Sequence, residues 1–256
     1  MNGELKTANS GFALRVEKLY SQLIVLAATG PATARESGSS LGGKLLFSGE
    51  LDAESRALIV AGSIAGAASL AVSRDPAAQR QAIREGTIDF SVNSLDEALR
   101  ILKNEIRKRQ PVAVCLALPA ATTIADFERE WRERGVVPDL TGPSAAPGAV
   151  LQGPEGALLV WSVASAAPQW LPRLDALAAT CLEPEEAAAR QWLQQAPRYL
   201  GRLAHGLRLV RCREESASRL LSELRLRTES GEIAVEIEVS QEIGGRISLH
   251  RFSPPK

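Results

Sequence analysis

The sequence has little of several residue types on which common functional sites depend. Its 256 residues include two histidines, three cysteines and one methionine, and aromatic residues make up only 4%. Cys115, Cys181 and Cys212 are far apart and odd in number, so they form neither a zinc-binding spacing nor a disulfide framework. His205 and His250 are isolated from each other and from any cysteine pair. We therefore predict no metal site, and the cysteine usage favours a reducing cytoplasm.

Net charge and long apolar runs are also missing. Thirty Lys and Arg residues balance thirty Asp and Glu residues, so no global basic field would attract nucleic acid or an anionic membrane. The longest apolar run, 57–72, is interrupted by glycine and serine and is too short to span a bilayer. The opening MNGELKTANSG lacks the basic start and apolar stretch of a secretory signal. We expect a cytoplasmic protein that binds neither nucleic acid nor membrane.

What the sequence does contain is a regular alternation of apolar strands with amphipathic helices. Short apolar runs of strand length occur at 44–48, 70–72, 111–118 and 157–163, and helical spacing fills the segments between them. Such alternation predicts right-handed crossovers and a parallel sheet covered by helices on both faces. We therefore predict an α/β fold, a Rossmann-like three-layer domain with an N-terminal helix, over residues 1–165.

The pattern changes after Ser165. Residues 168–180 and 183–210 have helical spacing, the second segment being interrupted at Pro197. Apolar residues then alternate with period two from 224 to 249, and Ser230-Gly231 and Gly244-Gly245 fall between the runs, which predicts two hairpins and a three-stranded antiparallel sheet. We expect residues 166–256 to form a C-terminal α+β extension of helices and a small antiparallel sheet.

Residues 49–58, GELDAESRAL, lie between the first strand and a helix rich in small residues. A dinucleotide-binding domain carries its glycine-rich phosphate loop at this place. Here the segment holds three carboxylates, those of Glu50, Asp52 and Glu54. They could form a site for a cation or a positively charged ligand. We favour a plain helix start, in which Asp52 is the N-cap, Ser55 is the third helical residue and Glu54 complements the helix dipole.

Several short stretches in the same order resemble the NAD-binding Rossmann-like domain of the urocanase (urocanate hydratase) family. They are LYSQL at 19–23, GGKLLF at 42–47, AGAASL at 65–70, LDEAL at 95–99 and RGVVPD at 134–139. The resemblance covers about residues 15–150. It implies a Rossmann-like fold, NAD as cofactor and a link with histidine breakdown through urocanate hydration.

The sequence departs from that family where NAD would bind. The family's loop GLGGMGGAQP corresponds to residues 50–59, which contain no glycine, and Ala53, Glu54 and Ser55 stand where the family has Gly-Met-Gly. A Cβ at each position blocks close approach of the backbone to a pyrophosphate. Carboxylates near phosphates add repulsion of order 1 kcal/mol per close pair. We expect that NAD, the cofactor implied by resemblance, is not bound and that no other cofactor replaces it.

Other positions implied by the resemblance differ as well. The acid that would meet the ribose falls on Ser73, and the family's Asn-Ala falls on Pro119 and Ala120. The family's QTSAHD loop becomes residues 142–147, which keep Ser144 but have no histidine or aspartate. Urocanase places its catalytic cysteine and most urocanate contacts in a surrounding core, to which this chain shows no likeness, so we assign no catalytic residue.

If a small molecule binds, the crevice beyond the carboxyl ends of the strands is the expected place. The predicted rim consists of Ala53, Glu54, Ser55, Ser73, Pro119, Ala120, Asp139, Thr141 and Ser144. Three functions stay open. The first is a urocanase-like protein without urocanate hydratase activity that acts in binding, assembly or regulation, and the second is a diverged enzyme using a nucleotide or small acid in the crevice. The third is a split assembly with a separate protein subunit, and a homo-oligomer through the C-terminal sheet edge is a further option.

Overall fold

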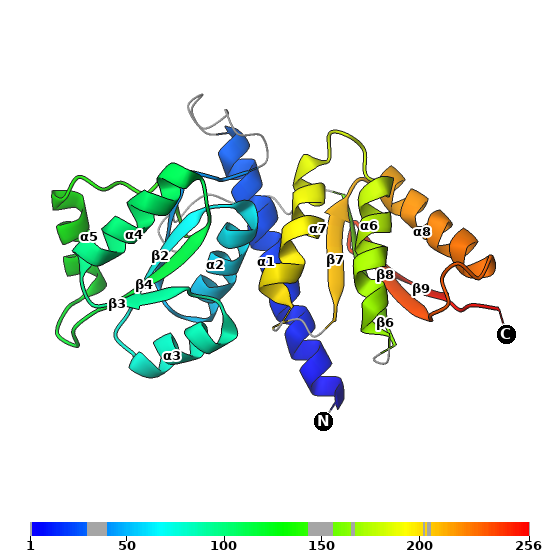
Figure 1. Cartoon of the computed structure of the whole chain (residues 1–256), viewed down its shortest axis with the longest axis horizontal. Coiled ribbons are helices and arrows are strands. Elements are labelled where there is room, and N and C mark those ends of the chain that lie inside the picture. Colours follow the sequence, from blue (N-terminus) through cyan, green and yellow to red (C-terminus); the bar gives the residue numbers. More distant parts are fainter. Residues whose placement is uncertain are drawn as a thin grey trace. The chain divides into compact units, whose positions relative to one another are not determined.

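The computed structural model describes residues 2–29, 40–142, 156–164, 167–201, 203 and 206–255. The chain divides into two compact units, Lys18–Gln152 and Met1–Glu17 with Gly153–Lys256, and Figure 1 labels most of their elements. Helix α1 (Asn2–Thr29) therefore begins in the second of these units and ends in the first. The two units are described separately below.

The first unit is built on a five-stranded parallel sheet. Its strands, in the spatial order β3-β4-β2-β1-β5, are β1 (Leu45–Glu50), β2 (Ala68–Ser73), β3 (Phe90–Val92), β4 (Val112–Ala117) and β5 (Leu140–Thr141). This arrangement confirms the predicted α/β, Rossmann-like class. Strand β3 was not predicted, because Phe90 and Ser91 are exposed and the segment is not a continuous apolar run.

Helices cover both faces of the sheet (Figure 1). They are α2 (Ala53–Ala65) and α3 (Pro76–Glu85) on one face, and α4 (Leu95–Lys108) and α5 (Ile124–Glu133) on the other. Alternate strand residues enter the two cores: Leu70 packs on the α4 and α5 side, and Ala71 packs on the α2 and α3 side. Burial of both strand faces explains the continuous apolar runs in the sequence.

Small residues let α2 lie close to the sheet. A Cβ built on Gly62 would come within 2.6 Å of Leu46 Cδ2 and 3.1 Å of Ser69 Oγ. The opposite face is filled instead by a cluster of three aromatic rings, in which Phe47 and Trp131 meet edge to face with centroids 4.9 Å apart and Phe127 contacts both. The sheet thus has one closely approached face and one face filled by large side chains.

The helix start predicted at Asp52 is confirmed, and two further helices of this unit begin in the same way. Asp52, Asp75 and Ser94 are the N-caps of α2, α3 and α4, and each side chain accepts a hydrogen bond from a backbone N–H of the first turn. Gly66 and Gly86 end α2 and α3 in the left-handed conformation, with φ of 94° and 74°. Local capping chemistry therefore fixes where these helices begin and end.

The second unit is an antiparallel sheet with helices, as predicted for the C-terminal extension. Its strands, in the order β7-β6-β8-β9, are β6 (Ala157–Val163), β7 (Arg208–Cys212), β8 (Ile237–Ile243) and β9 (Arg246–Phe252). Its helical segments after β6 are η3 (Pro168–Trp170), α6 (Leu171–Cys181), α7 (Ala187–Leu200) and α8 (Glu214–Glu229). Glu17 of α1 forms a bidentate ion pair with Arg211 of β7, at 3.0 and 3.1 Å, and is itself buried.

The assignment of β6 to the parallel sheet is wrong. This strand was expected within a first domain reaching residue 165, but it pairs antiparallel with β7 and β8, and it falls in the second unit, which resumes at Gly153. Its apolar run ALLVWSV has the same appearance in either kind of sheet, because residues on both of its faces are buried.

The secondary structure of the tail also differs from the prediction. Residues 208–212 are strand β7, although a helix was expected to continue to residue 210. Residues 214–229 are helix α8, although a strand was expected to begin at residue 224. Leu220 and Leu224, four residues apart, are both buried in α8, whereas Leu226 is exposed. Pro197 lies inside α7 and does not end it. The hairpin at Gly244-Gly245, between β8 and β9, is confirmed within a four-stranded sheet.

Candidate functional site

The topology of the parallel sheet marks one crevice. Strands β1 and β2 lead into helices on one face, whereas β3 and β4 lead into helices on the other. The direction of the connections therefore changes between the neighbouring strands β2 and β4. In open α/β sheets, ligands bind beyond the carboxyl ends of the strands at such a switch point.

The turn from β1 into α2 is closed by the side chains of the chain itself. Asp52 Oδ1 accepts the backbone N–H of Ser55 at 2.7 Å. Ser55 Oγ donates to Ser48 Oγ at 2.9 Å, and Ser48 Oγ donates to the carbonyl of Leu70 at 3.2 Å. Ser55 is only 3% exposed. The predicted helix start is thus confirmed, and a hydrogen-bonded chain ties it to β1 and β2.

The remaining charges at this turn also have partners. Glu50, the last residue of β1, forms an ion pair with Arg74 directly after β2, at 3.3 Å. Glu54 is exposed in the first turn of α2. Gly49, just before Glu50, has φ of 83° at the bulge of β1, so its backbone conformation accounts for a glycine there.

A dinucleotide bound as in the family's loop does not fit these residues. The pyrophosphate would need backbone N–H groups at the start of α2 and room close to them. The N–H of Ser55 is already taken by the Asp52 carboxylate, and the Ser55 side chain lies between the helix and β1. A cation site has no better support, since the described residues contain no group of three His, Cys, Asp or Glu side chains that could hold a metal ion.

The other rim residues are scattered. Ser73 is 2% exposed, and its hydroxyl accepts the backbone N–H of Asp75 at 3.1 Å within its own loop. Pro119 and Ala120 are exposed in the loop after β4, and Ala53 is exposed in the first turn of α2. Thr141 is exposed and pairs with β1 at Phe47. These side chains share one end of the sheet, and the hydrogen bond of the Ser73 hydroxyl with the Asp75 N–H stays within its own loop.

Asp139 does not lie on this rim. Its carboxylate accepts the backbone N–H of Leu45 at 2.8 Å and pairs with Lys44 at 3.2 Å, which places it at the start of β1. The reason is that β5 begins at Leu140, so Asp139 precedes the strand and lies at the amino end of the sheet. Ser144, the last predicted rim residue, falls outside the described residues, and so does His205.

The cysteines are poor nucleophiles in this fold. Cys115, Cys181 and Cys212 are all free and buried. Burial raises the pKa of Cys115 to about 12 and, with help from the nearby Glu186 carboxylate, raises the pKa of Cys212 to about 12. Burial also raises the pKa of Cys181. Such thiols stay protonated near neutral pH, and the thiolate is the reactive form.

A buried ion pair in the second unit contains a carboxyl group with a raised pKa. Asp175 and Arg208 meet at 2.9 Å, and burial raises the pKa of Asp175, although the guanidinium of Arg208 opposes this rise. The cavity beside the pair, lined partly by Trp192 and Leu200, has a volume of only 10 Å³. That is room for about one water molecule, so we read the pair as structural.

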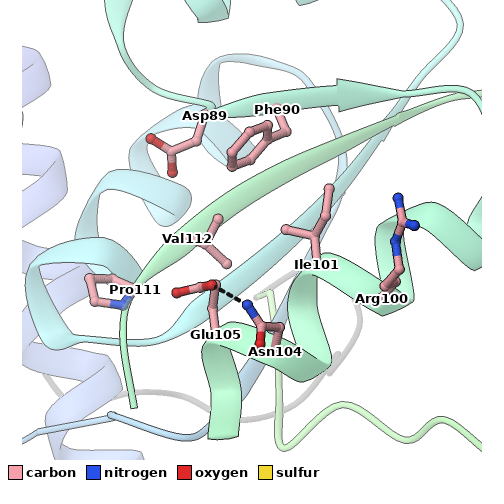
Figure 2. Close-up of a pocket in the computed structure, with 8 residues that line it drawn as sticks. All are labelled: Asp89, Phe90, Arg100, Ile101, Asn104, Glu105, Pro111 and Val112. Carbon is pink, nitrogen blue, oxygen red and sulfur yellow. Dashed lines mark hydrogen bonds between the residues drawn. The ribbon is translucent and has the colours of Figure 1, made fainter. Parts of the chain in front are cut away.

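Sequence reasoning missed a groove at the opposite end of the parallel sheet. It has a volume of 810 Å³, and Figure 2 shows its lining residues: Asp89, Phe90, Arg100, Ile101, Asn104, Glu105, Pro111 and Val112. They come from the start of β3, from α4 and from the start of β4. No sequence pattern indicates this groove, because its three segments come together only in the tertiary fold.

The comparison with known families agrees with the fold. The family model described as the urocanase Rossmann-like domain matches residues 25–155, just over half of the chain and nearly all of the first unit. Within the described residues, no helix combines the length and apolar character needed to cross a membrane. On the strength of this match, the chain belongs to the urocanase family through its Rossmann-like domain.

Proposed function

We propose that this urocanase-family protein acts in binding, assembly or regulation and lacks urocanate hydratase activity, because its Rossmann-like domain does not hold NAD⁺. The observation that carries the proposal is the 2.7 Å hydrogen bond from the Ser55 N–H to the Asp52 carboxylate. A helix N-terminus binds a pyrophosphate through free backbone N–H groups and its positive dipole. Here a carboxylate uses one of those groups and puts negative charge where the phosphates would lie.

Two further features support the proposal. Ser55 donates a buried hydrogen bond to Ser48 at the same turn, so the space beside β1 is filled by protein atoms. The buried thiols, with their raised pKa values, offer no nucleophile among the described cysteines. We also propose a cytoplasmic location, which suits three free thiols.

Calorimetric titration of NAD⁺ into the protein tests the proposal directly. We expect no heat above dilution up to millimolar NAD⁺, and no loss of urocanate absorbance when protein, NAD⁺ and urocanate are mixed. A urocanase that carries the glycine-rich loop, measured in parallel, provides the positive control. Saturable heat from NAD⁺ would contradict the proposal, and saturable heat from another nucleotide or a small carboxylic acid would favour the alternative of a diverged enzyme.

We propose that the assembly partner is a second copy of the chain, with a separate protein subunit as the alternative. Strand β9 is the edge of its sheet, and its Ile247 and Leu249 are 73% and 61% exposed. Exposed apolar residues on an edge strand favour pairing with another strand. Light scattering after size exclusion should show a dimer that Leu249→Lys converts to a monomer. Leu226→Lys, at an α8 residue that is also 61% exposed, is the matched control and should leave the dimer intact; a monomeric wild type would contradict this proposal.

A further inference from the structure

The groove between β3 and α4 is separate from the crevice discussed above. Asp89 directly precedes β3, and Pro111 and Val112 begin β4, so the groove starts at the amino ends of these strands. The crevice lies at the carboxyl ends. Ligand binding in the groove therefore does not depend on whether NAD⁺ binds.

One side of the groove is an open edge of the parallel sheet. Strand β3 is the outermost strand, and within the described part of the chain no other strand pairs with its outer side. The N–H of Asp89 donates to the carbonyl of Ala113 in β4 at 2.8 Å. Because backbone groups of successive strand residues point to opposite sides, Phe90 and Val92 direct their N–H and C=O groups away from β4. Such a row of donors and acceptors is a template for an added strand.

The floor of the groove is apolar and partly open to solvent. Phe90 is 48% exposed, whereas Val112 beneath it is 5% exposed. Ile101 of α4 continues the apolar surface, and Figure 2 shows these three side chains along the middle of the groove. The volume of 810 Å³ lies within the range of about 300–1,000 Å³ that is usual for ligand pockets.

The two ends of the groove carry opposite charge: one has an arginine and the other has carboxylates. Arg100 lies toward the carboxyl end of β3, and within the described residues it has no ion-pair partner. Asp89 and Glu105 lie toward the amino end. Asp89 is held by a 2.8 Å hydrogen bond from the Ala113 N–H, and Glu105 already forms an ion pair with Lys108 at 2.8 Å, so Asp89 supplies the main negative charge at this end. Arg100 and Glu105 are about 7.5 Å apart along the axis of α4. The first and third of three alternate residues in an extended chain are about 13 Å apart, and the long, flexible charged side chains of both partners span the difference.

We propose that this groove binds an extended peptide segment, which adds to β3 as a further strand and places an acidic, an apolar and a basic side chain in the groove. The acidic side chain meets Arg100, the apolar one packs on Phe90 and Ile101, and the basic one meets Asp89 and Glu105. Side chains on the same face of a strand alternate, so the three belong to every second residue of the peptide. A small molecule would contact the side chains but would leave the backbone edge of β3 unpaired, which is why a peptide fits better.

Fluorescence polarisation with a labelled peptide tests the side-chain part of the proposal. The probes are Ser-Glu-Thr-Val-Thr-Lys-Ser and the same sequence reversed, because the peptide could run in either direction along β3. We expect saturable binding of at least one of them to the full-length protein. Arg100→Glu should weaken it by about tenfold or more, since it sets like charges against each other. Arg80→Glu is the matched control: Arg80 is exposed on α3, on the other face of the sheet, and its reversal should leave binding unchanged.

Backbone methylation of the peptide tests strand addition itself. One variant of the probe that binds is N-methylated at the central valine, and a second is N-methylated at both threonines. A strand paired with β3 uses the N–H groups of only one of these two sets, so one variant should lose binding and the other should keep it. Equal binding of the two variants would overturn strand addition. Failure of both probes to saturate at millimolar protein, or an equal loss with Arg100→Glu and Arg80→Glu, would overturn the proposed groove as a peptide site.

Discussion

The two ends of the parallel sheet differ in whether side chains of the protein fill them. At the carboxyl ends, Asp52 caps α2, Ser55 bonds Ser48, and Glu50 pairs with Arg74, so polar groups of the chain satisfy one another. At the amino ends of β3 and β4, a groove of 810 Å³ stays open beside the edge strand. In most open α/β sheets the carboxyl ends carry the ligand. The comparison teaches that topology only offers a place for a site, and that side chains decide whether it is used.

The largest expected effect is the difference in stability loss between truncating Leu51, which is buried in the core, and truncating Phe90, which is half exposed in the groove. Leu51, directly after β1, is 5% exposed and packs in the core under α2. Leu51→Ala should lower the free energy of unfolding by about 2–5 kcal/mol, because it leaves a cavity. Phe90→Ala, in the groove, should lower it by less than about 1 kcal/mol, because Phe90 is already 48% exposed. Urea denaturation of both variants measures the difference.

The stability of Phe90→Ala decides whether the groove is open in solution. A loss at Phe90 as large as that at Leu51 would mean that other parts of the protein cover this side chain in solution. The groove would then be part of the core, and the comparison between an open and a filled end would fail. A small loss, combined with weaker binding of the peptide probe, would assign Phe90 to recognition instead of folding.

Local chemistry made much of the fold predictable. A short polar side chain before an apolar helix marks an N-cap, and Asp52, Asp75 and Ser94 all take that role. The pairing of the strands was harder to predict from the sequence. The apolar run of β6 suits a parallel or an antiparallel neighbour equally well, and only pairing with β7 and β8 places it. Strand β3 has a single buried residue, Val92, and so carries no apolar run that could have been recognised.

The candidate site was less predictable than the fold, for a geometric reason. Asp139 was predicted to lie on the rim beyond the carboxyl ends of the strands, but β5 begins one residue after it, so Asp139 lies at the amino end of the sheet. The groove brings together Asp89, Arg100 and Pro111 from segments whose distances from each other depend on how α4 lies on the sheet. Such a juxtaposition has no signature in a single sequence.

Substitutions at the turn between β1 and α2 should have a smaller effect on stability, and they test which interaction closes that turn. Asp52→Ala removes the acceptor of the Ser55 N–H and should lower the free energy of unfolding by about 1 kcal/mol, the usual effect of losing an N-cap. Asp52→Asn keeps the cap and should stay within a few tenths of the wild type, on the same principle. Glu50→Gln removes only the exposed pair with Arg74 and should change stability by less than about 1 kcal/mol. Thermal or urea unfolding ranks the three variants, and a loss with Asp52→Asn equal to that with Asp52→Ala would show that charge, and not the hydrogen bond to Ser55, closes this turn.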